Sequence, residues 1–233
     1  MLVTKRNWLR HRHCILIAGS LAGMVVPALA GDLKGRIIAE GMQAPESSIL
    51  SRSIIQRYAA HQHHDAGDGM KKHDDFVAVV YIEGLENSSR GVTSPVAVMD
   101  QQHERFLPHV LPITVGSTVR FLNSEEVFHN VFSLSPVKSF DLGRYPKGQH
   151  REVVFDKTGV VSVYCDIHTQ MNAVILVVPN RFFTITDAAG NFVIKDIPPG
   201  DHEVRVWYGR QPEKSTTVII KEQGTTELIL SIP

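Results

Sequence analysis

Short apolar runs separated by turn-forming residues recur along most of the chain. The run at 76–82 is followed by a turn rich in Gly, Asn and Ser, and the run at 159–164 alternates apolar residues on one face. Such runs are typical of strands in β-sandwiches. The same pattern predicts further strands at 96–99, 111–115, 117–122, 127–134, 152–155 and 173–178. It leaves 141–148 as a turn-rich connection, and it predicts an all-β fold class.

Two segments depart from the strand pattern. Residues 1–30 combine a basic start, a short apolar centre and an Ala-x-Ala end, which predicts a secretory signal peptide, a periplasmic location and no membrane span after cleavage. Residues from about 42 to 75 look like an insertion, with apolar residues at helical spacing near Leu50 and Ile54. The tract from His61 to His73 could bind metal, although a solvated loop is the favoured interpretation.

Charge and cysteine content narrow the function classes. Removing residues 1–30 leaves 20 Lys and Arg against 24 Asp and Glu, a mildly acidic balance that argues against nucleic acid as a partner. It also leaves Cys165 as the only cysteine, in a compartment where thiols usually pair. A lone cysteine there is a reactive thiol, an inert buried residue or a metal ligand.

The residues after the strand at 159–164 favour the metal ligand. Cys165 continues the alternation of Val161 and Val163, and His168 and Met171 follow at three-residue steps. Sulfur donors favour copper over magnesium or calcium, and two imidazoles, a thiolate and a weak axial thioether form electron-transfer copper sites. Zinc fits poorly because a thioether is not among its usual ligands. The second imidazole has a candidate upstream in His129, which Asn130 follows.

This order of residues, a His followed by Asn and then Cys-x-x-His-x-x-Met after an apolar strand, resembles the cupredoxins. The loop spacing is closest to that of amicyanin-like members. The resemblance covers roughly residues 76–178. It implies a Greek-key β-sandwich with one type 1 copper ion held at one end by His129, Cys165, His168 and Met171. It also implies that Asn130 ties its strand to the Cys165 loop, and that His168 presents an edge to solvent in an apolar patch with Ile167 and Met171.

The chain changes character after Pro179. The Thr-Asp-x-x-Gly-x-Phe and Pro-Pro-Gly segments resemble the carboxypeptidase regulatory-like, or transthyretin-like, β domain. We therefore expect a copper domain at 31–178 and a smaller β-sandwich-like domain at 179–233. At about 55 residues the tail is short for an independent core, so we expect it to pack on the first domain and to share a sheet with the strand that begins at Gly31.

Three functions fit these residues. The first is a periplasmic electron carrier that exchanges single electrons with redox partner proteins such as a cytochrome or a dehydrogenase, as the resemblance implies. The second is a copper-binding or copper-delivery protein in which the His61–His73 tract takes part. The third is a structural β protein whose site stays empty. An enzymatic role is not expected, because the chain shows no nucleophile paired with a base and no further complete metal set.

Overall fold

The computed structural model describes residues 30–39, 77–85, 96–209 and 212–233. None of these residues lies in a helix, and so none of them forms a helix able to cross a membrane. The expected all-β class is confirmed. The expected signal peptide at 1–30, apart from Ala30, and the expected insertion at about 42–75 with its His61–His73 tract lie outside the described residues. The strands are β1 (Gly31–Ala39), β2 (Val79–Glu83), β3 (Ala97–Gln102), β4 (Arg105–Leu107), β5 (Val110–Thr114), β6 (Thr118–Asn123), β7 (His129–Ser135), β8 (Lys138–Tyr145), β9 (His150–Val154), β10 (Gly159–Tyr164), β11 (Asn172–Val178), β12 (Phe183–Ile185), β13 (Asn191–Ile197), β14 (Gly200–Trp207), β15 (Lys214–Ile220) and β16 (Thr225–Ile232).

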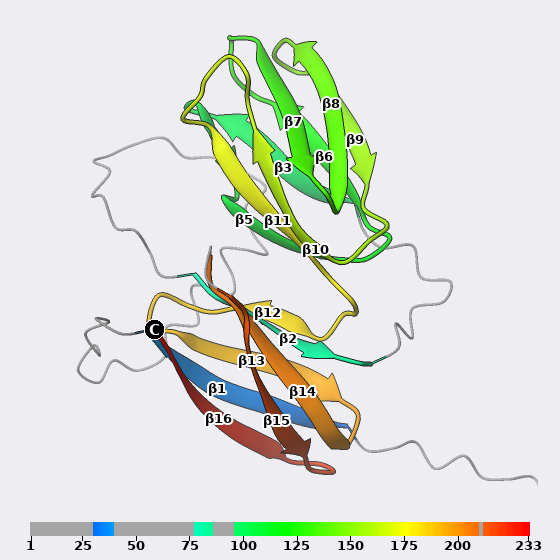
Figure 1. Cartoon of the computed structure of the whole chain (residues 1–233), viewed down its shortest axis with the longest axis vertical. Helices are drawn as coiled ribbons and strands as arrows, with labels where there is room; N and C mark the ends of the chain where they lie inside the picture. The colour runs from blue at the N-terminus through cyan, green and yellow to red at the C-terminus, as the bar shows by residue number, and fades with distance from the viewer. Residues whose placement is uncertain (1–29, 40–76, 86–95, 210–211) are drawn as a thin grey trace, which may run out of the picture.

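Strands β3 to β11 form one β-sandwich (Figure 1). Its sheets have the strand orders β5-β11-β10-β7-β8 and β4-β3-β6-β9. Between them lies a core that includes Phe121, Phe155, Val161 and Ile175, all fully buried. Alternation places Val119 and Phe121 of β6, and Val161 and Val163 of β10, in this core. Two sheets packed around one core are consistent with the expected cupredoxin-like sandwich.

The hairpin of β10 and β11 carries the loop on which the site depends. The two strands pair antiparallel from Gly159 opposite Val177 to Tyr164 opposite Asn172. The loop between them, residues 165–171, lies at the end of the sandwich that is farthest from β1, β2 and β12 to β16 (Figure 1). Strand β7, which begins at His129, is the other neighbour of β10 in the sheet. His129 and the loop are therefore brought to the same end.

Strand β8 corrects one expectation from the sequence. Residues 141–148 are not simply a turn-rich connection, because β8 extends to Tyr145 and pairs with β7. The register shifts between Asn130 and Phe132, so Leu142 and Gly143 together face Val131. Gly143 has φ 64°, a left-handed conformation that glycine adopts without steric cost. The turn-like composition of residues 141–145 is therefore explained by a β-bulge, which lies close to His129 on the neighbouring strand.

The remaining strands form a second sandwich, with sheet orders β13-β1-β16 and β12-β2-β14-β15. The expected sharing of a sheet between the Gly31 strand and the tail is found: β1 pairs parallel with β16 and antiparallel with β13. Strand β1 is central in that sheet. The grouping of β2 differs from the expected boundary at residue 178, because β2 pairs with β12 and β14 of the tail. Strand β2 is a continuous apolar run, which could be buried in either sandwich.

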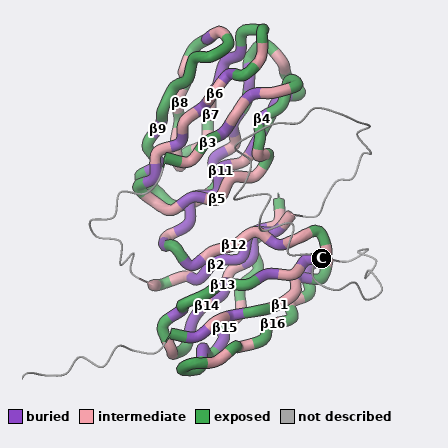
Figure 2. Tube along the Cα trace, turned by 180° about the vertical axis from the view of Figure 1, so that it is seen from behind, coloured by how far each residue is buried: buried purple, intermediate pink, exposed green. Residues whose placement is uncertain are grey.

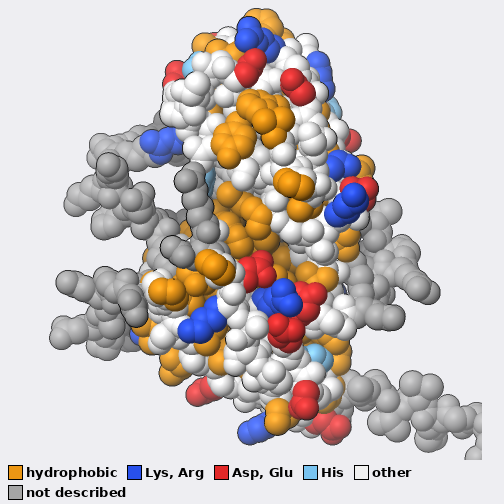
Figure 3. Space-filling model, in the orientation of Figure 1, with side chains coloured by type: hydrophobic (Ala, Val, Ile, Leu, Met, Phe, Trp, Pro, Cys, Tyr) orange, Lys and Arg blue, Asp and Glu red, His pale blue; other side chains and the backbone are white. Residues whose placement is uncertain are grey.

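The two sandwiches meet through an apolar contact. Ala173, Ile175 and Val177 of β11 face the first core, whereas Leu176 and Val178 pack against Val79, Tyr81 and Trp207 of the second unit. Both faces of β11 are therefore covered, which explains its uninterrupted apolar sequence. Figure 2 shows buried residues along the strands of both units and at this junction. On the second unit, Arg205 of β14 forms ion pairs with Glu203 at 3.3 Å and with Glu83 at 3.5 Å. Figure 3 shows acidic and basic side chains gathered on one face of the molecule.

Candidate metal centre

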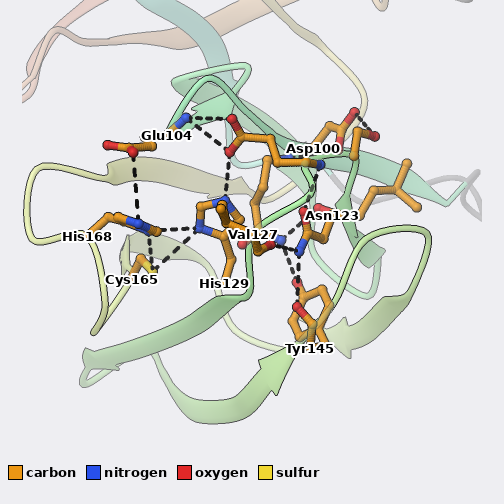
Figure 4. Close-up of polar contacts among 12 residues, drawn as sticks. Asp100, Glu104, Asn123, Val127, His129, Tyr145, Cys165 and His168 are labelled. Carbon is orange, nitrogen blue, oxygen red and sulfur yellow. Dashed lines mark hydrogen bonds and ion pairs between the residues drawn. The ribbon is translucent and has the colours of Figure 1, made fainter.

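Three of the four expected ligands converge at the free end of the first sandwich (Figure 4). Sγ of Cys165 lies 3.9 Å from Nδ1 of His129 and 4.0 Å from Nδ1 of His168. The two imidazole nitrogens are 3.1 Å apart. His129 is fully buried and Cys165 is 3% exposed, whereas the side chain of His168 is 20% exposed. Among the described residues this is the one group of three His, Cys, Asp or Glu side chains arranged to hold a metal ion.

The donor triangle has the size that a metal ion requires. A point equidistant from the three donor atoms lies about 2.1 Å from each of them, close to the roughly 2.0–2.3 Å bonds of metal to imidazole and thiolate. One thiolate and two imidazoles are soft and borderline donors, which suit copper. The residues present therefore fit a copper ion.

Met171 lies in the same loop and is buried, with 1% of its surface exposed. Its carbonyl oxygen accepts a hydrogen bond from the Cys165 amide at 3.3 Å, and its amide donates to the His168 carbonyl at 2.9 Å. These bonds close the loop and place the Met171 side chain in the same apolar cluster as Cys165. Its role as an axial ligand stays a prediction. Because it is buried, Met171 does not contribute to an exposed apolar patch.

Glu125 is a residue of the site that the sequence did not indicate. Its Oε2 lies 2.6 Å from Nε2 of His129, so Nε2 carries the proton and Nδ1 is left with a lone pair directed at Cys165 and His168. Partial burial raises the pKa of Glu125, but hydrogen bonds from the Glu104 amide, the His129 ring and the His103 amide outweigh burial and hold this pKa below its usual value. The carboxylate thus fixes the orientation of the buried imidazole.

The loop that carries Glu125 is itself held by Asn123. The Asn123 amide group donates to the carbonyls of Val127 at 2.9 Å and Tyr145 at 3.0 Å, and its Oδ1 accepts from the Glu125 amide at 2.9 Å. Asn123 is 1% exposed, so these bonds are formed out of water. Burial also raises the pKa of the neighbouring Tyr145, partly offset by its hydrogen bond with Gln101. The segment that leads into His129 is therefore rigidly tied to the end of β8.

Asn130 connects the first ligand strand to the cysteine loop, as the resemblance led us to expect. Its Oδ1 accepts a hydrogen bond from the Asp166 amide at 3.4 Å, and its Nδ2 donates to Asp141 at 2.7 Å. Arg144 adds an ion pair with Asp166 at 3.1 Å. The residue that follows Cys165 is thus held from both β7 and β8.

The surface around His168 is partly apolar. Ile167 is 37% exposed, as expected for a patch residue, and Phe128, in the loop before His129, is 56% exposed. His109 is exposed, and its Nδ1 lies within hydrogen-bond distance of the Asn172 carbonyl oxygen, at 3.0 Å. It takes no part in the donor triangle.

Comparisons with known proteins give structural similarity only. No family model and no curated protein sequence matches the chain. A copper-containing nitrite reductase from Thermus scotoductus SA-01 is 24% identical with a TM-score of 0.34, over 36% of this chain and 22% of that one. A purple cupredoxin from Nitrosopumilus maritimus is 26% identical with a TM-score of 0.33, over 35% and 99%. A reduced amicyanin variant is 22% identical with a TM-score of 0.35, over 42% and 98%.

Proposed function

We propose that this chain is a periplasmic type 1 copper protein that passes single electrons between redox partner proteins. The observation that carries the proposal is the donor triangle of His129, Cys165 and His168, with sides of 3.9, 4.0 and 3.1 Å. Met171 would complete the set as the weak axial donor. When bound, copper supplies a one-electron couple at this triangle.

The residues around the donor triangle suit an electron carrier because their hydrogen bonds restrain the positions of the donor atoms. The Nε2–H of His129 is fixed by Glu125 at 2.6 Å, and the cysteine loop is closed by the hydrogen bonds of Met171. A site that moves little between oxidation states lowers the barrier to electron transfer. His168, with a side chain 20% exposed, is the ligand through which a docked partner would be reached.

The test is the colour of the copper-loaded mature chain. We expect a strong thiolate-to-copper absorption in the visible and a narrow hyperfine EPR signal, and Cys165→Ser should abolish both because the thiolate is lost. His109→Ala is the matched control, since that histidine lies outside the donor triangle.

A colourless protein with stoichiometric copper would contradict the electron-carrier proposal and favour copper binding or delivery. Deleting residues 61–73 separates these functions further. An electron carrier keeps its copper without that tract, whereas a delivery protein that depends on it loses uptake.

A further inference from the structure

The turn between β3 and β4 lies beside the metal centre and has an unusual backbone. His103 and Glu104 have φ values of 54° and 52°. Two left-handed residues in succession form the two-residue hairpin turn that usually requires Asn or Gly, because other side chains raise its energy. Contacts with the surroundings must therefore hold this turn in place.

The backbone of Glu104 supports the buried histidine. Its amide donates to both carboxylate oxygens of Glu125, each at 3.1 Å. Glu125 in turn accepts from Nε2 of His129 at 2.6 Å. The turn is thus connected to His129 through hydrogen bonds to Glu125.

The side chain of Glu104 reaches the exposed histidine. Its Oε2 accepts a hydrogen bond from Gln170 at 2.6 Å, and its Oε1 lies 3.9 Å from Nε2 of His168. Figure 4 shows this carboxylate facing the outer edge of the His168 ring, while the inner edge faces Cys165 and His129. Gln170 belongs to the same loop as His168, so Glu104 is fastened to that loop on the side where the imidazole meets solvent.

We propose that Glu104 is a positioning residue that orients His168 and lowers the reduction potential of the centre. This inference rests on the proposed copper function. A carboxylate near the outer nitrogen of a ligand imidazole orients the ring and makes it a stronger donor. Its negative charge also stabilises Cu(II) more than Cu(I), because the oxidised ion carries the larger positive charge. The side chain of Glu104 is 51% exposed, so solvent reduces this effect without removing it.

The test is Glu104→Gln, which keeps the shape of the side chain, its acceptor for Gln170 and the backbone amide, but removes the charge. We expect the ratio of Cu(II) affinity to Cu(I) affinity to fall about threefold to tenfold, where tenfold corresponds to a rise of about 59 mV in the one-electron midpoint potential. The visible spectrum and the unfolding temperature of the metal-free chain should stay as in the parent. Gln170→Ala, which frees the carboxylate, should shift the potential in the same direction by less.

Glu126→Gln is the matched control. Glu126 is an exposed carboxylate in the loop before His129, and it pairs with Lys147 rather than with a histidine. A potential in Glu104→Gln no higher than in Glu126→Gln would overturn this inference and leave the blue copper centre standing. A parent chain that takes up no copper would overturn the proposed function and this inference with it.

Discussion

His129 and His168 face the centre of the donor triangle through the same ring nitrogen, but their outer nitrogens lie in different surroundings. Nε2 of His129 is buried against Glu125, at 2.6 Å, whereas Nε2 of His168 lies 3.9 Å from the partly exposed carboxylate of Glu104. Hydrogen bonds to such outer nitrogens set the tautomer and the basicity of a ligand. The orientation of His129 is thus fixed by a contact in the interior, whereas His168 keeps an edge in contact with solvent.

Removing the Glu125 carboxylate tests its hold on His129. We expect Glu125→Ala to weaken copper binding by about 10- to 100-fold, because the imidazole loses the acceptor that orients it. The measurement is a competition titration against a copper chelator. Glu126→Ala, which removes the adjacent carboxylate, should bind copper like the parent. An unchanged affinity in Glu125→Ala would show that the backbone alone positions His129.

The sequence predicted the metal ligands of the Cys165 loop, but not the two glutamates, Glu104 and Glu125, that contact the ligand histidines. Cys165, His168 and Met171 lie in one short loop, so their spacing alone brings two donors together and suggests the third. Glu104 approaches the site only because β3 pairs with β6 and its hairpin turn reaches Glu125. No short-range pattern records such a contact. Glu125 lies four residues before His129, but that spacing signals a contact in helices, not in a loop.

At the scale of elements, β1 shows how the neighbours of a strand in a sheet are selected. Its alternation predicts a strand, and a strand of this kind pairs equally well with many partners. Close packing against the tail selects the partners of β1. A Cβ atom on Gly35 would lie 2.1 Å from the carbonyl oxygen of Leu228, and a Cβ atom on Gly190 would lie 2.0 Å from the carbonyl oxygen of Ile37. Strand β1 therefore depends on glycines at positions where the backbones approach each other closely.

Two glycines with similar backbones test this packing. Gly190 has φ 81° and Gly84 has φ 75°, but the position of a Cβ on Gly84 is free of atoms within 4 Å. We expect Gly84→Ala to lower the free energy of unfolding by about 1 kcal/mol, the cost of a left-handed alanine. Gly190→Ala should cost about 3 kcal/mol or more, because it also pushes β1 away. Chemical denaturation of the mature chain measures both, and equal losses would contradict the pairing of β1 with the tail.

At the scale of the whole molecule, the two sandwiches are joined by the outer face of one sheet. Leu176, 1% exposed on β11, lies in the junction with Tyr81 and Trp207, whereas Leu134, on β7 of the same sheet, is 78% exposed. Figure 3 shows apolar side chains on the surface of this sandwich. On β10, Tyr164 is 39% exposed, and its ring centre lies 5.8 Å from that of Phe132 on β7. The second unit therefore covers only part of this sheet.

A charge introduced at these two leucines measures how much the junction contributes. We expect Leu176→Asp to lower the free energy of unfolding by about 3–5 kcal/mol, because it buries an unpaired charge. Leu134→Asp should change it by no more than about 0.5 kcal/mol. Thermal unfolding followed by circular dichroism distinguishes the two. Similar unfolding temperatures for both variants would mean that the sandwiches do not rely on this contact.

The strand order gives the first sandwich two attachments to the second. The chain leaves the second unit after β2 and returns at β12, and these two strands are antiparallel neighbours, with Phe183 opposite Tyr81. The first sandwich is therefore inserted between two neighbouring strands of the second unit rather than appended to one end of it. In the proposed function, the apolar junction of β11 with Tyr81 and Trp207 would keep the donor triangle at a constant distance and direction from the second unit, so that whatever binds the second unit would also orient the copper site.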